Sequence, residues 1–190
     1  CDVARCGSAV QGEWVPLASG LGLASWASVG ADGSVTLMPM TALSTLLVSH
    51  AEALGGGRLT LAAVDVARLR VAGLVGLSPD QLLARPGNIL DTLWLEAASP
   101  EAVKVAVLSA AMAELATINA KGIDQVLADL AARFNELDGH LLQAGDAQSL
   151  ESLLQAVGSL AAGNPAVQEK VQAWLDAFVA GLRSGELNTG

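Results

Sequence analysis

Gly33-Ser-Val-Thr-Leu-Met-Pro-Met-Thr-Ala-Leu-Ser-Thr-Leu-Leu47 decides the fold, because it has the pattern of a strand that turns directly into a helix. Val35 and Leu37 alternate with neighbours that are mostly polar, which is the period of a half-buried strand. Pro39 cannot continue a sheet ladder, and Thr41 is a residue type that commonly caps a helix. We therefore expect β-structure before Pro39 and helices after it.

The rest of the chain divides at the same point. We expect a β-rich N-terminal segment over residues 1–38 and a helical domain over residues 39–190. The candidate strands are 11–15, 22–29 and 34–38, and the turn at 30–33 contains Asp-Gly, a strong hairpin signal. The predicted fold class is mainly α: a multi-helix bundle with a small N-terminal β-hairpin or β-sheet region.

Capping residues, prolines and glycines delimit the expected helices. These are predicted over 41–54, 60–74, 79–85, 88–98, 100–121, 123–137, 146–162 and 165–183. Three of the later helices carry apolar residues at i, i+3, i+4 and i+7, as packed helices do. One such stripe is Val103, Val107, Ala111, Leu115 and Ile118. After about residue 40 we expect no strand longer than three residues.

Composition excludes several classes of function. The 190 residues are 52% hydrophobic and 15% charged, and the net charge is -9. This acidic balance argues against a nucleic-acid surface and against an anionic membrane surface. Two uncharged stretches, 14–31 and 33–51, are interrupted by Pro16 and Pro39, so we expect no membrane span. So little charge leaves apolar surface for a partner.

The junction and three later motifs resemble a family of proteins. Residues 35–43 resemble the Val-Thr-Pro-Leu-Thr-type junction of large bacterial secreted proteins and lipoproteins. Gly73-Leu-Val-Gly-Leu77, Asn88-Ile-Leu-Asp91 and Ala110-Ala-Met-Ala-Glu-Leu115 follow in a similar order, so the resemblance covers roughly residues 10–120. It implies an extracellular or bacterial cell-surface location, in a structural or matrix role, and it carries over no catalytic residue.

The two cysteines, Cys1 and Cys6, admit three interpretations. A disulfide that closes a tight loop fits an exported protein, and it is the interpretation that we favour. A lipid on Cys1 would instead make the protein membrane-anchored. Free thiols or metal ligands are the third, although two cysteines and two distant histidines do not readily supply a metal site.

Candidate catalytic groups are few. His50 and His140 are the histidines of the chain, and a hydrolase triad around His50 would draw on Ser44, Ser49, Asp65 or Asp91. There is no Gly-x-Ser-x-Gly elbow, so we interpret His50 as a surface or helix-end residue. The carboxylates of Asp124, Asp129, Glu136 and Asp138 are expected on a solvated face. We predict no enzyme, no cofactor and no metal site.

Two hypotheses on function remain. The first is a self-associating extracellular protein, such as a filament, sheath or surface-matrix subunit, whose partners are copies of itself. We place that contact in the charge-poor segment 10–38, with Trp14, Trp26, Val35 and Leu37 as its residues. The alternative is a module that binds cell-surface carbohydrate or another ligand through an exposed tryptophan.

Overall fold

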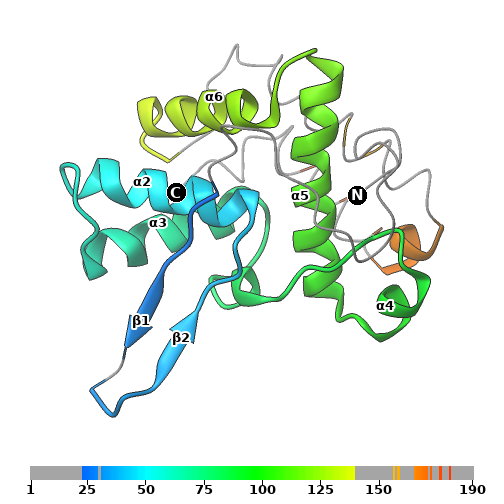
Figure 1. Ribbon diagram of the computed structural model, residues 1–190, viewed down its shortest axis with the longest axis horizontal. Coiled ribbons are helices and arrows are strands. Elements are labelled where there is room, and N and C mark those ends of the chain that lie inside the picture. The colour runs from blue at the N-terminus through cyan, green and yellow to red at the C-terminus, as the bar shows by residue number, and fades with distance from the viewer. Residues whose placement is uncertain are drawn as a thin grey trace, which may run out of the picture.

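The computed structural model describes residues 23–29, 31–139 and 165–170, together with positions 156, 158, 172, 176 and 180. This part of the protein is mainly helical, which confirms the predicted class. Its elements in chain order are β1 (Ala27–Val29), β2 (Val35–Leu37), α2 (Ala42–Leu54), α3 (Leu61–Leu74), the 3₁₀ helix η1 (Gln81–Leu83), α4 (Thr92–Ala97), α5 (Pro100–Ile118) and α6 (Ile123–Glu136) (Figure 1). Residues 165–170 are helical as well.

The two strands form an antiparallel hairpin in which Ala27 lies opposite Leu37 and Val29 opposite Val35. At its tip the Asp32 carboxylate accepts hydrogen bonds from the backbone N–H and the hydroxyl of Ser34, at 3.0 and 2.6 Å. Both strands fall within the ranges predicted from the sequence but are only three residues long. The strand expected over 11–15 lies outside the described residues.

The junction between the hairpin and α2 is built as the sequence predicts. Thr41 is the N-cap of α2, and it forms a capping box with Ser44 in which each side chain bonds the backbone N–H of the other. The Ser44 hydroxyl also reaches the carbonyl of Ala24 at 2.6 Å, and the Ala24 N–H donates to the hydroxyl of Thr45 at 3.0 Å. These bonds tie the base of the hairpin to the first turn of α2.

Four helices end in the same way. In each, an N–H bonds the carbonyl five residues earlier, and the residue before that N–H has a positive φ, which is the Schellman motif. The donor and acceptor pairs are Gly57 and Glu52, Leu77 and Ala72, Lys121 and Ala116, and Gly139 and Phe134. The positive-φ residues are Gly56, Gly76, Ala120 and Asp138. Because Ala120 takes this position, α5 ends at Ile118, earlier than the predicted 121.

Two predicted helices are shorter than expected. The segment 79–85 forms only the 3₁₀ turn η1, although Ser78 and Gln81 do make the two reciprocal bonds of a capping box. The helix expected from Asn88 begins at Thr92, with Asp91 as its N-cap. Asn88 instead accepts from the N–H of Leu90 and closes a turn ahead of the helix.

The core lies around α5, which runs across the other helices (Figure 1). This helix buries residues on more than one side, among them Val105, Val107 and Leu108, as expected for a helix that is apolar nearly all round. Phe134 of α6 is fully buried, and α2 packs against both α3 and α6. Each buried side chain of this size contributes about 1.5–3 kcal/mol relative to exposure.

Candidate functional site

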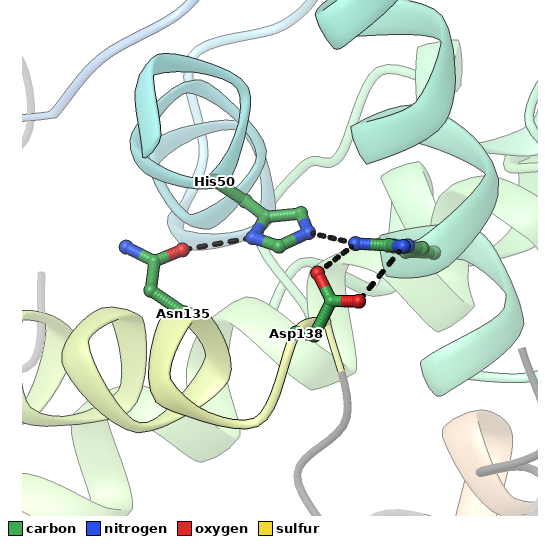
Figure 2. A network of polar contacts seen from close by, with 4 residues as sticks. His50, Asn135 and Asp138 are labelled. Atoms are coloured by element: carbon green, nitrogen blue, oxygen red, sulfur yellow. Dashed lines mark hydrogen bonds and ion pairs between the residues drawn. The ribbon is translucent and has the colours of Figure 1, made fainter. Parts of the chain in front are cut away.

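A polar cluster centred on His50 of α2 extends from the helical core to the surface (Figure 2). The His50 side chain is buried, and the residue is 1% exposed. Its Nδ1 is 2.8 Å from Oδ1 of Asn135 on α6, and its Nε2 is 3.1 Å from Nη1 of Arg70 on α3. The ring also meets Phe134 edge-on, with the centroids 4.6 Å apart. The prediction of a surface or helix-end histidine is therefore wrong.

The partners of His50 define its protonation state. A guanidinium can only donate, so Nε2 accepts from Arg70, and the amide oxygen of Asn135 accepts from Nδ1–H. The Asn135 amide nitrogen donates in turn to the hydroxyl of Ser49 at 3.3 Å, which is consistent with this orientation of the amide. Arg70 is held from its other side by both carboxylate oxygens of Asp138, at 2.7 and 3.3 Å. The neutral imidazole with its proton on Nδ1 fits this cluster.

The residues considered for a triad do not assemble around His50. A general base must lie within hydrogen-bond reach of the nucleophile that it activates. Ser49 instead bonds Asn135, Ser44 is occupied by Thr41 and Ala24, and Asp91 caps α4. The arrangement is that of a structural tie between three helices.

Gly139 completes this tie at the end of α6. Its φ is +87°, and a Cβ at this position would collide with Cδ of Arg70 and come within 3.0 Å of the His50 Nε2. Only glycine accommodates both the backbone conformation and the close approach. The end of α6 is thus fitted to the buried cluster.

The carboxylates of α6 and its C-terminal turn lie on the solvated face, as predicted. Asp124, Asp129, Glu136 and Asp138 are all exposed. Asp129 accepts from Lys121 at 2.8 Å and from Gln125 at 2.7 Å, and these hydrogen bonds lower the pKa of its carboxyl. Glu136 pairs with Arg133. Paired, exposed carboxylates of this kind contribute little to chemistry.

An open pocket of about 360 Å³ lies where the junction before α2 meets α5, α6 and the loop before α4. Its described lining is largely apolar and includes no charged residue and no aromatic ring. Two of its polar groups are already used: Thr41 caps α2, and the hydroxyl of Ser109 donates to the carbonyl of Val105. The pocket can hold a small apolar group but offers no platform for stacking a sugar.

The outward-facing side of α3 is largely apolar. Its exposed positions are Leu61, Ala62, Asp65, Val66, Leu69 and Gly73, of which only Asp65 is charged. Leu61 is 75% exposed and Leu69 is 62% exposed. The exposed Leu59 immediately precedes this helix. This face was not predicted from the sequence, because residues 59–74 contain three charged residues, Asp65, Arg68 and Arg70. Only the structure shows that both arginines are paired elsewhere, with Asp80 and Asp138.

The residues predicted for self-association are only partly described. Val35, on β2, is 57% exposed, and Leu37 lies on the same strand. Trp26 is half-buried and packs against the core, and its indole Nε1 is buried with no hydrogen-bond partner in the described part of the chain. Trp14, Cys1, Cys6 and His140 lie outside the described residues.

The described residues contain neither a metal-binding cluster nor a membrane-spanning helix. No group of three or more His, Cys, Asp or Glu side chains there is placed to hold a metal ion. No helix in the same part of the chain combines the length and apolarity needed to cross a bilayer.

The resemblance of residues 35–43 to a junction in secreted proteins stays an expectation from the sequence. Comparison of the whole chain with protein-family models, with curated proteins and with solved structures finds no match.

Proposed function

We propose that this protein is a non-enzymatic structural subunit that assembles with copies of itself, outside the cell or at the cell surface. The observation that carries the proposal is the β1–β2 hairpin, which projects from the helical body (Figure 1). Within the described residues each strand pairs only with the other. Val35 adds an exposed apolar side chain to one of them.

Such a hairpin is suited to strand addition. The outer edges of a two-stranded sheet present unpaired backbone N–H and C=O groups, which another chain can use. Two strands alone are marginally stable in water, so a further strand from a neighbour would stabilise them. A contact between the hairpin and a different surface of the next copy does not close on itself, and it therefore produces an open assembly.

The attachment of the hairpin supports this role. The hydroxyl of Ser25 donates to the carbonyl of Met38 at 2.6 Å, and Ala24 is bonded to the first turn of α2. The strands thus leave the helical body in a fixed direction. A regular assembly repeats one contact, so each copy must present its strand edge to the next copy at the same angle.

The overall charge predicts how assembly depends on salt. At a net charge of -9, copies repel one another at long range. Salt screens this repulsion over about 10 Å at 0.1 M ionic strength. A contact made of apolar side chains and backbone hydrogen bonds should therefore strengthen, or stay unchanged, as salt is raised to physiological levels and beyond.

The test is a double substitution, Val35→Lys with Leu37→Lys, compared with Leu93→Lys as a control. Leu93 is a leucine of α4 that is 76% exposed, so the control adds charge without touching the hairpin. We expect the wild type and the control to form large species in light scattering and regular objects in negative-stain microscopy. The double variant should stop forming them and keep its helical circular dichroism. Large species that persist in the double variant, or that dissolve in moderate salt, would overturn the proposal.

The alternative hypothesis, a ligand-binding module, is favoured by one observation, the open pocket beside α5. Its lining fits a small apolar ligand better than a carbohydrate, because its described residues carry no aromatic ring. Replacing Ala110 with Phe would fill this space. Loss of binding of an apolar fluorescent probe in that variant, together with a monomeric wild type, would favour this second function.

A further inference from the structure

The helix α3 is apolar on both of its faces. Its inner face packs on the core through residues such as Val64, Ala67 and Val71. Its outer face carries Leu61, Val66 and Leu69, which are 75%, 39% and 62% exposed. Apolar side chains gathered on one exposed face are typical of an interaction surface. The outer face of α3 is therefore a candidate contact surface.

Two opposite charges border this face. Arg58 lies in the loop before α3, and Asp65 lies on the outer face itself, and both are exposed. Within the described residues neither side chain has an ion-pair or hydrogen-bond partner. The two cations of α3 itself are already paired, Arg68 with Asp80 at 3.0 Å and Arg70 with Asp138 at 2.7 Å.

We infer that a second copy of this chain covers the outer face of α3, in a twofold contact that pairs Arg58 of each copy with Asp65 of the other. We call this face, made by Arg58, Leu59, Leu61, Ala62, Asp65, Val66 and Leu69, the α3 patch. The inference rests on the proposed self-association and assigns it a second, closed contact.

The distribution of charge favours a copy of this chain over another partner. In a twofold contact every group meets its own counterpart, so the surface must be complementary to itself. Arg58 lies ahead of the first residue of α3, Leu61, and Asp65 lies one turn into the helix, so the two charges flank positions 61 and 62. An axis that passes between these two positions, with the two α3 helices antiparallel, brings each Arg58 opposite the other copy's Asp65.

The net charge of the molecule also favours the α3 patch as the contact between copies. A chain of net charge -9 repels its copies over most of its surface. The α3 patch contains one cation and one anion, so it is neutral, and its centre is leucine. Two copies therefore meet there with less repulsion than elsewhere and remove apolar surface from water.

The experiment is a charge exchange measured by sedimentation equilibrium. All variants carry Val35→Lys and Leu37→Lys, so that assembly through the hairpin does not obscure a dimer. Arg58→Asp alone, or Asp65→Arg alone, places like charges across the axis twice, and each should raise the dimer Kd about tenfold or more. The two together recreate both ion pairs and should return the Kd to within about threefold of its parent.

A second pair of variants tests the apolar centre. Leu61→Asn should abolish the dimer, and Leu93→Asn, which changes an equally exposed leucine on α4, should leave it unchanged. Helical circular dichroism shows whether each variant folds. A parent that stays monomeric, a dimer that survives Leu61→Asn, or single reversals that the double exchange does not rescue would each overturn the inference.

These outcomes are separate from those of the proposed function. If the wild type forms nothing larger than a dimer, and Leu61→Asn dissociates that dimer, the hairpin contact is wrong and the α3 contact stands. If the wild type assembles and the hairpin variant is monomeric at every concentration, the α3 contact is wrong and the hairpin contact stands. If all proteins, the wild type included, are monomeric, both are wrong.

Discussion

The hydrogen bond between His50 and Asn135 should be measurable as a coupling energy between α2 and α6. The two atoms are 2.8 Å apart, and the bond joins residues 85 positions apart in the chain. We propose three variants, His50→Leu, Asn135→Leu and both together. Leucine fills most of either side chain's volume and removes its polar atoms, so the changes remove the bond without leaving a large cavity.

The expected magnitudes follow from the burial of each partner. Asn135→Leu leaves the Nδ1–H of His50 without its acceptor in a site that is 1% exposed, which costs about 1–3 kcal/mol. His50→Leu should cost less, because Asn135 is half-buried and can reach water, and because Arg70 keeps Asp138. The double variant leaves neither group unsatisfied. Its cost should therefore fall short of the sum of the singles by about 1–2 kcal/mol.

Urea unfolding followed by far-ultraviolet circular dichroism gives these free energies. For a chain of this size, 2 kcal/mol corresponds to a fall of about 4–8 °C in Tm. Thr60→Ala, which removes the distant N-cap of α3, is the control, and its effect should add to that of Asn135→Leu. If the two core substitutions also add to within about 0.5 kcal/mol, the bond does not couple the helices and the reasoning fails.

Three other changes test the described structure. Ala120→Gly should raise the free energy of unfolding by about 0.5–1 kcal/mol in a urea titration, because φ at this position is +51° and glycine adopts it without strain. Gly139→Ala should lower it by about 1–3 kcal/mol, because its Cβ would strike Arg70 where φ is already +87°. The Asp129 carboxyl should titrate by NMR below its ordinary pKa, and Lys121→Ala should raise that pKa. Since the folded pKa is the lower one, stability from this contact is present above the unfolded pKa and is lost as the pH falls through the folded value.

The helix ends that the sequence predicted correctly are those fixed by hydrogen bonds between residues close together in the chain. Thr41, Thr60 and Ser99 each accept an N–H from the first turn of the following helix, three residues ahead in the chain. The glycines at 55–57 end α2 as expected. Such bonds depend on a few neighbouring residues, so a sequence shows them directly.

The start of α4 was predicted wrongly because two nearby residues could each cap this helix. Asn88 and Asp91 can both cap a helix, and the structure uses Asn88 for a turn and Asp91 for α4. Gly87 explains part of this outcome, because a Cβ there would collide with the indole of Trp94. That close approach between the loop and α4 is a tertiary contact, which propensities do not reveal.

The cluster around His50 lay beyond prediction for the same reason. Leu43, Leu46 and Leu47 precede His50 by seven, four and three residues and place it on the apolar face of α2, but its partners come from α3 and α6. Its burial follows only once α2 is placed against both of those helices. For a single histidine on the apolar face of a helix, the Asn, Asp and Arg residues near the ends of later helices are therefore candidate hydrogen-bond partners.

The two proposed contacts have different consequences because they differ in symmetry. A strand-edge contact is open, so it can extend from copy to copy without limit, whereas a twofold contact at the α3 patch closes after two copies. Used together, they would link dimers into a chain in which every copy has both surfaces occupied. Removing the hairpin contact would then leave dimers, and removing the α3 contact would leave single threads of half the mass per length. Mass per length is thus the quantity that separates the two contacts within one assembly.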